Sequence, residues 1–251
     1  MTSYGLAEMT HDERLELAGR LRDRMLERYG GSVLAIFVTS STARGLDLEF
    51  SDLELTAVHR DGAAPPDRAY YHRGILIEVS HVEESKILAP RMEARWAETA
   101  GGHRARIVLY EHARWTERLD QALDALDAAD RRPAQRSALL DLLEFRDKLR
   151  NARVTGDEIF IRACAVYFAD SATNFVLFLN GQYMITTRWF FRQALECPDR
   201  PPELREYLEV LLGVRRADTV EILEAAEALS EDLVRMAGAH GIIAESEELL
   251  A

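Results

Sequence analysis

Two stretches of this sequence carry acidic side chains at a spacing that suits metal chemistry. Asp52 and Glu54 lie in the run Phe50–Leu55, and Glu78 lies inside the apolar run Ile75–Val79. On a strand, residues two apart point to the same face, so Asp52 and Glu54 would lie side by side. Neighbouring carboxylates repel each other unless a cation neutralises them. Mg²⁺ is the fitting cation, because it is usually held by one or two carboxylates together with substrate phosphates.

A polar turn precedes these acids. Ser40, Ser41 and Arg44 follow the apolar run Val33–Val38. Hydroxyls and backbone N–H groups at a strand-to-helix turn can hold a phosphate, although an ordinary helix N-cap uses the same residue types. Taken alone, the acids are better explained as part of a solvent-facing strand edge. Together, the turn and the three acids favour a metal-dependent phosphoryl or nucleotidyl transfer site.

Other candidate groups in the sequence are weaker indications of a functional site. Glu144 and Lys148 are four residues apart in a helical pattern, and this spacing alone indicates a surface ion pair that stabilises a helix by about 0.2–0.5 kcal/mol. The seven histidines show no paired spacing of the kind that binds zinc. Cys164 and Cys197 also lack metal-ligand spacing, so we expect two reduced thiols in a cytosolic protein.

Composition limits the class of protein. The chain has 251 residues, of which 47% are hydrophobic, enough for one large domain or two small ones. No apolar run is long enough to cross a bilayer and no signal peptide is recognisable, so we expect a cytoplasmic protein without a membrane partner. The net charge of −12 argues against a nucleic-acid partner and suits a cationic small substrate, although many proteins are acidic for solubility alone.

The helices and strands that must position these residues are of two kinds: both strands and helices are predicted in the first part of the chain, and only helices in the second. The apolar patterns predict a helix over 11–29, strands over 33–38, 53–58 and 75–79, a helix over 82–96 with a kink or split at Pro90, a break at Gly101–Gly102 and a short strand over 105–110. From about residue 115 onward only helical periodicity remains. The apolar run 159–179 is interrupted by Asp170, Ser171 and Asn174, and the last helix is predicted to begin at Asp218.

This pattern predicts an α+β protein, with a mixed β-sheet flanked by helices followed by a C-terminal helical bundle. We place the boundary so that the α/β domain covers residues 1–118 and the helical domain covers 119–251.

With these residues in place, the chain resembles the kanamycin nucleotidyltransferase family of aminoglycoside 4′-O-adenylyltransferases, within the polymerase-β-like nucleotidyltransferase superfamily. The resemblance runs over nearly the whole length, and the spacing of the acidic motif is its most specific part. The matching segments, in chain order, are Met9–Arg14, Leu26–Gly30, Ser41 to Glu54, Ile77–Val79, Leu143–Asn151 and Thr186–Thr187.

The resemblance implies that the N-terminal domain is a nucleotidyltransferase domain that transfers AMP from ATP to a hydroxyl group and releases pyrophosphate. In this reading Asp52 and Glu54 would bind Mg²⁺, and through it the ATP. Glu78 would be the third acid of the catalytic set. The implied substrate is a small, cationic, aminoglycoside-like molecule, and the implied role is antibiotic resistance.

The resemblance also assigns the remaining site residues. Ser41, Arg44 and Ser51 would contact the phosphates of ATP, and Lys148 would hold its triphosphate. Glu144 would be the general base that accepts the proton of the acceptor hydroxyl. The family forms homodimers with the active site at the interface, so Glu144 and Lys148 would act with the acids of the partner subunit. For Glu144 and Lys148, the resemblance therefore favours a role in the active site over the surface ion pair that their spacing alone indicates.

The chain departs from the family pattern at four positions. Ser40 replaces the glycine of the Gly-Ser signature, where its side chain would crowd the triphosphate, and Ala43 replaces a second glycine. Ala69 and Leu140 replace two acids that help to hold the aminoglycoside. These departures keep two alternatives open: the fold is reused for ATP-independent biosynthetic chemistry, or it serves as a non-catalytic binding module.

Overall fold

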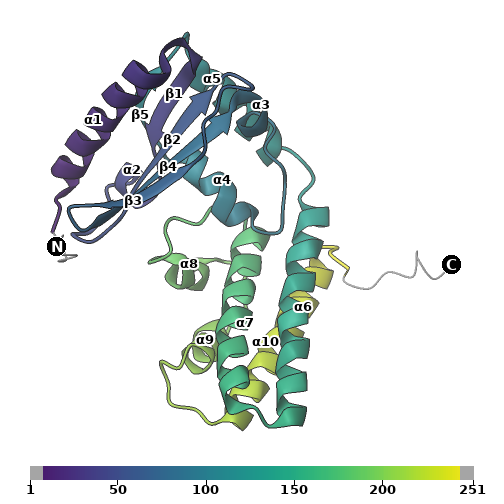
Figure 1. Cartoon of the computed structure of the whole chain (residues 1–251). Helices are drawn as coiled ribbons and strands as arrows, with labels where there is room; N and C mark the ends of the chain where they lie inside the picture. Colours follow the sequence, from purple (N-terminus) through teal and green to yellow (C-terminus); the bar gives the residue numbers. More distant parts are fainter. Residues whose placement is uncertain (1–7, 244–251) are drawn as a thin grey trace. The chain divides into compact units, whose positions relative to one another are not determined.

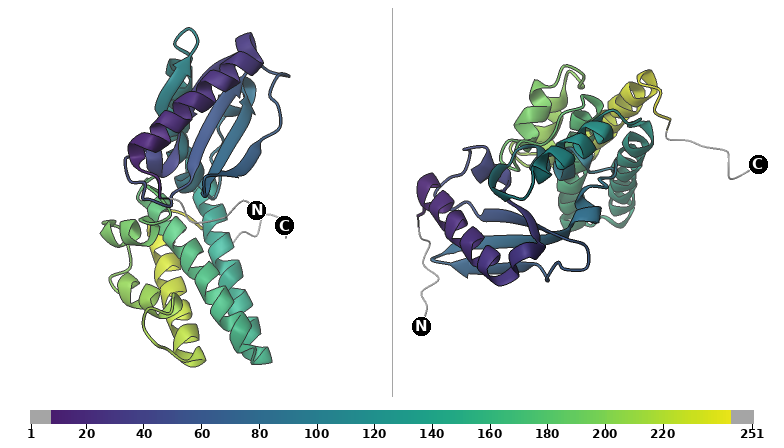
Figure 2. Two further views of the ribbon diagram at one scale, coloured as in Figure 1. Left: turned by 60° about the vertical axis from the view of Figure 1, so that its left-hand side comes forward. Right: turned by 90° about the horizontal axis from the view of Figure 1, so that it is seen from above.

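The computed structural model describes residues 8–243, which divide into two compact units (Figures 1 and 2). The first unit contains the described residues of Met1–Arg91 together with Thr99–Ala129, and the second contains Met92–Glu98 with the described residues of Asp130–Ala251. The boundary that the sequence suggested, at 118/119, falls within helix α5 (Trp115–Asp127) of the first unit.

The first unit is built on a five-stranded mixed sheet in the order β3-β4-β2-β1-β5. β2 and β4 are parallel, and the other neighbouring strands are antiparallel. The strands are β1 (Val33–Val38), β2 (Leu53–His59), β3 (Arg68–His72), β4 (Ile75–Glu83) and β5 (Ile107–Glu111). The α+β class is therefore confirmed, as are the predicted strands, to within a few residues at their ends.

Helices cover both faces of this sheet. α1 (His11–Tyr29) packs Leu17 and Met25 against one face, as the predicted helix over 11–29 requires. On the other face, α5 packs Trp115 and Leu119 against inward-pointing residues of β1. β1 is buried along its whole length because it lies in the sheet interior between these two layers, which explains its continuous apolar sequence.

The prediction for residues 82–96 is wrong. β4 continues to Glu83 because its parallel pairing with β2 extends to the end of both strands. The short α3 (Glu84–Ile87) follows, and the next helix, α4 (Trp96–Arg104), includes the glycine pair Gly101–Gly102 that we expected to break the chain. Helix propensity is a weak guide that tertiary contacts override. One such contact is the hydrogen bond that Arg44 donates to the carbonyl of Gly101.

Strand β3 was not predicted. All five of its residues are exposed, so it has no apolar alternation for a sequence pattern to detect. It forms a hairpin with β4 and pairs Ala69 with Glu78.

The second unit is helical, as the sequence predicts. Its long helices α6 (Arg132–Thr155) and α7 (Glu158–Leu179) pack along each other, and α10 (Thr219–Ala239) packs against both (Figure 1). The shorter α8 (Phe190–Glu196) and α9 (Leu204–Leu211) lie against α7. Asp218 caps α10 with a capping box, which confirms the predicted start. Among the described residues, no helix is both long and apolar enough to cross a membrane.

A buried ion pair ties α1 to the loop that leads into the acidic motif. Arg14 is fully buried and pairs with Asp47, whose side chain is 1% exposed. The same guanidinium donates to the carbonyl oxygens of Leu48 and Glu49, at 2.9 and 3.2 Å. His11 contacts Asp47 from the exposed side at 2.7 Å. The ion pair therefore fixes the segment that directly precedes Asp52.

Replacing the buried arginine should lower the urea concentration at which the protein unfolds. Arg14→Met leaves the Asp47 carboxylate buried without its main partner, so we expect the free energy of unfolding to fall by about 3–5 kcal/mol. Urea denaturation followed by circular dichroism measures this change. Arg20→Met is the matched control, because Arg20 lies on the same helix in an exposed pair with Glu16, and it should cost less than about 1 kcal/mol. Equal losses in the two variants would contradict this role for the buried pair.

Candidate active site

Three acids converge at one place on the sheet of the first unit. Asp52 directly precedes β2, Glu54 lies in β2, and Glu78 lies opposite Glu54 in the neighbouring parallel strand β4. One carboxylate oxygen from each residue lies within 4.8 Å of the others. The register of the β2–β4 pair therefore brings together the two acidic motifs that are separated by more than twenty residues in sequence.

The electrostatics of this cluster favour a bound cation. Burial raises the pKa of the Glu54 carboxyl, a hydrogen bond from Ser40 lowers it, and the nearby charges of Asp52 and Glu78 raise it further. Three carboxylates so close together destabilise one another when ionised. An all-oxygen donor set with this charge fits a hard cation such as Mg²⁺, which would offset the repulsion.

Ser40 has an unusual backbone conformation beside this cluster. It begins α2 (Ser40–Ala43) with φ +56°, in the left-handed region that favours glycine. A side chain in this region costs roughly 1–2 kcal/mol. Its hydroxyl donates a hydrogen bond to Oε2 of Glu54 at 2.5 Å, and the neighbouring N–H of Thr39 donates to the Glu54 carbonyl at 3.1 Å. Ser40 thus occupies one oxygen of a proposed metal ligand.

Two of the three residues predicted to contact phosphates, Ser41 and Arg44, belong to the turn that Ser40 begins, and the third, Ser51, lies in the loop before β2. Ser41 lies in α2. Ser51 accepts a hydrogen bond from the N–H of Leu48 at 2.9 Å, which orders the loop before β2. Arg44 donates to the Gly101 carbonyl at 2.9 Å, and burial lowers the pKa of its guanidinium. Their phosphate contacts stay predictions.

Glu144 and Lys148 belong to the second unit, on α6, whereas the three acids belong to the first. The Lys148 ammonium lies 2.7 Å from a Glu144 carboxylate oxygen, as their four-residue spacing predicts. The same ammonium lies 4.5 Å from the ring centroid of Phe145. Their predicted roles as base and triphosphate ligand stay predictions.

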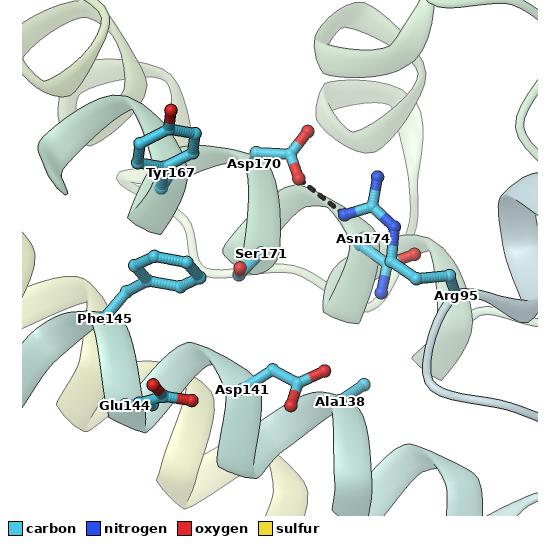
Figure 3. Close-up of a pocket in the computed structure, with 9 residues that line it drawn as sticks. All are labelled: Arg95, Ala138, Asp141, Glu144, Phe145, Tyr167, Asp170, Ser171 and Asn174. Carbon is cyan, nitrogen blue, oxygen red and sulfur yellow. Dashed lines mark hydrogen bonds and ion pairs between the residues drawn. The ribbon is translucent and has the colours of Figure 1, made fainter. Parts of the chain in front are cut away.

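A polar cavity beside Glu144 was not predicted. It has a volume of about 350 Å³ and lies in the second unit, where α6 and α7 face each other (Figure 3). Its lining residues are Arg95, Ala138, Asp141, Glu144, Phe145, Tyr167, Asp170, Ser171 and Asn174. A signal for it existed in the sequence, because Asp170, Ser171 and Asn174 are the polar residues that interrupt the apolar run of α7.

Comparison with solved structures identifies the fold. A nucleotidyltransferase-like protein from Exiguobacterium sibiricum 255-15 superposes with a TM-score of 0.56 at 16% sequence identity, over 90% of this chain and 78% of that chain. At this identity the likeness shows the fold alone. The fold is that of nucleotidyltransferase-like proteins.

Sequence comparisons identify the family. The model of the KNTase C-terminal domain matches residues 113–243, just over half of the chain. The chain therefore belongs to the KNTase family that this domain defines. Relatives named aminoglycoside nucleotidyltransferase (4′), from Staphylococcus aureus and a Bacillus species, are each 23% identical over 240 residues, covering 94% of this chain and 95% of the relative. The family and these relatives support the nucleotidyltransferase class of enzyme.

Removing one charge from the acidic cluster should stabilise the metal-free protein. We expect Asp52→Asn to raise the free energy of unfolding by about 0.2–1 kcal/mol in buffer with a chelator, because it relieves like-charge repulsion. Added Mg²⁺ should raise the unfolding midpoint of the original protein and leave that of Asp52→Asn nearly unchanged. Urea titrations with and without Mg²⁺ measure both effects.

Glu49→Gln is the control for this experiment, since it removes an exposed acid of the same unit outside the cluster. It should keep the full response to Mg²⁺. A metal response that persists in Asp52→Asn, or a variant that is less stable than the original protein without metal, would contradict the metal-site assignment.

Proposed function

We propose that the protein is an Mg²⁺-dependent nucleotidyltransferase that transfers AMP from ATP to a hydroxyl group of an aminoglycoside-like amino sugar and releases pyrophosphate. The observation that carries this proposal is the convergence of Asp52, Glu54 and Glu78 within 4.8 Å. The KNTase family match and the names of the relatives support the type of reaction.

Each group of the site has a defined role in this proposal. Asp52 and Glu54 would hold Mg²⁺, with Glu78 as the third acid, because their carboxylate oxygens form the donor set described above. Mg²⁺ held by these residues would supply positive charge that offsets the charge developing in the transfer step. Ser41, Ser51, Arg44 and Lys148 are donors to the phosphates, which position the triphosphate for in-line attack.

In the reaction, one proton is transferred, one O–P bond forms and another O–P bond breaks. The acceptor hydroxyl oxygen attacks the α-phosphorus of ATP, the new O–P bond forms, and the bond from the α-phosphorus to the bridging oxygen breaks as pyrophosphate leaves. The Glu144 carboxylate accepts the proton of the attacking hydroxyl, for which it must lie within hydrogen-bond reach of the acceptor. Lys148, which pairs with Glu144 at 2.7 Å, would turn to the triphosphate when ATP binds.

The active site in this proposal is shared between two copies of the chain. The resemblance to kanamycin nucleotidyltransferases is the support for a homodimer in which Glu144 and Lys148 of the partner subunit complete the site of Asp52.

A cationic acceptor fits the overall charge of −12. Two positions that carry drug-binding acids in the family hold uncharged residues here. Ala69 lies on the exposed strand β3, and Leu140 lies on α6 with 38% of its surface exposed. Recognition of amino groups by this chain must therefore rely on other acids.

A second candidate function follows from Ser40. Its hydroxyl already occupies an oxygen of Glu54, and it stands where the family has glycine. This contact favours a protein that has given up nucleotide and uses the fold for ATP-independent chemistry or for binding. Mg²⁺-dependent transfer of AMP would exclude this alternative directly.

The proposed function is tested by incubating the full chain with ATP, Mg²⁺ and kanamycin. We expect pyrophosphate release and a product heavier than kanamycin by one adenylyl group in mass spectrometry. Glu144→Gln should lower kcat by a factor of about 100 or more while nucleotide binding is retained, because only the proton acceptor is lost. Absence of any adenylylated product from kanamycin and other amino sugars would contradict the proposal.

Mixing two inactive variants tests the shared site. If each site combines Asp52 of one subunit with Glu144 of the other, mixed dimers of Asp52→Asn and Glu144→Gln contain one intact site. Random re-association of equal amounts would then restore about a quarter of the original activity, as two-fold symmetry requires. If both residues of a site came from one chain, no intact site would form and no activity would return.

A further inference from the structure

The cavity beside Glu144 is lined by charged, polar and aromatic side chains, most of which have no role in the proposed transfer step. α6 contributes Ala138, Asp141, Glu144 and Phe145 at helical spacing, and α7 contributes Tyr167, Asp170, Ser171 and Asn174 in the same way. Residues three and four apart share a helix face, so the two faces enclose one polar space (Figure 3). Arg95 closes one end of it and the two aromatic rings close the other.

The charges in this cavity are unbalanced. Asp170 pairs with Arg95 at 2.6 Å, and Glu144 pairs with Lys148 at 2.7 Å. The third acid, Asp141, is open to solvent on one side and makes no hydrogen bond or ion pair with any residue of the described range 8–243. Burial raises the pKa of its carboxyl, and the neighbouring Glu144 raises it further, whereas Arg95 lowers it. A bound cation would offset this unfavourable charge.

A buried acceptor without a partner lies in the same cavity. Asn174 is 3% exposed, and its Nδ2 donates to the carbonyl of Ala94 at 2.7 Å. That bond fixes the orientation of the amide, since a carbonyl can accept only from the NH₂ group. The Oδ1 atom is buried and has no hydrogen-bond partner among the described residues. A buried acceptor left unpaired is costly, and native proteins rarely tolerate it without a ligand or water.

Aromatic rings form the opposite end of the cavity. Phe145 and Tyr167 stack with their centroids 5.6 Å apart and their planes 25° from parallel. Aromatic faces attract organic cations and provide apolar area for a ring-shaped ligand. A metal ion is a poorer match, because the described residues bring three metal-ligating groups together only at Asp52, Glu54 and Glu78.

We propose that this cavity is the subsite for an ammonium-bearing sugar ring of the acceptor. Asp141 is the counter-ion of the ammonium group, one ammonium N–H donates a hydrogen bond to Asn174 Oδ1, and the Phe145–Tyr167 pair contacts the ring. This assignment rests on the proposed function for the identity of the acceptor. It gives Asp141 a role in drug binding that the family assigns to the two acids absent at Ala69 and Leu140.

The place of Asp141 on α6 also constrains the acceptor. Asp141 precedes Glu144 by three residues, which corresponds to about 4.5 Å along the helix axis. A hydroxyl that reaches Glu144 and an amine that reaches Asp141 must therefore lie on the same sugar ring or on adjacent rings. The reacting hydroxyl and the recognised amine are close neighbours in the substrate.

Binding without nucleotide tests the subsite separately from the transfer reaction. Isothermal titration of the full chain with kanamycin should show that Asp141→Asn and Asn174→Leu each weaken binding by about tenfold or more, because each removes a bond to a charged group. Asp141→Glu should recover most of the affinity. Asp147→Asn, an exposed acid on the same helix outside the cavity, should bind like the original protein. Raffinose, an uncharged trisaccharide, should show no dependence on Asp141.

Two outcomes overturn the proposal. One is unchanged kanamycin affinity in both Asp141→Asn and Asn174→Leu, and the other is absence of kanamycin binding to the original protein. The transfer assay decides the fate of the proposed function independently. If kanamycin is adenylylated while the cavity variants keep their KM, the subsite is wrong and the enzyme assignment stands. If kanamycin binds through Asp141 but no AMP is transferred, the subsite stands and the enzyme assignment fails.

Discussion

Repulsion among three carboxylates is the constraint on which the rest of the structure depends. The parallel pairing of β2 and β4 places Glu54 beside Glu78, and Asp52 joins them from the preceding loop. Such an arrangement costs stability in a protein without a cation, so the surrounding structure must hold it in place. The buried Arg14–Asp47 pair fixes the loop before Asp52, and the apolar layers on both sides of β1 hold the sheet.

Ser40 is the departure from the family pattern that directly contacts the acidic cluster. A left-handed φ of +56° suits the family's glycine, and serine adopts it here with a hydrogen bond to Glu54. The contact partly relieves the charge of Glu54 when no metal is bound. In the proposed function the same hydroxyl would compete with a cation for that oxygen, so Ser40 would have to release Glu54 before metal and nucleotide bind.

The sequence predicted the parts of the fold that follow from apolar periodicity. The buried strand β1, the helix α1 and the start of the last helix at Asp218 were all recognisable. β3 was not, since a fully exposed strand lacks alternation, and α4 was missed because it contains the glycine pair that we expected to break the chain. For the candidate site, the acidic motif was visible in the sequence because it is a local pattern. The cavity between α6 and α7 depends on how two distant segments face each other, and Asp170 and Asn174 signalled it only as interruptions of an apolar run.

The most direct test of the account is titration of the protein with a non-hydrolysable ATP analogue, with and without Mg²⁺. The account predicts binding that requires Mg²⁺ and is lost in Asp52→Asn, because the carboxylates hold the nucleotide through the metal. Ser40→Gly should bind more tightly than the original protein, since it frees the Glu54 oxygen. Absence of nucleotide binding in both the original protein and Ser40→Gly, or binding indifferent to Mg²⁺ and to Asp52, would contradict the central claim.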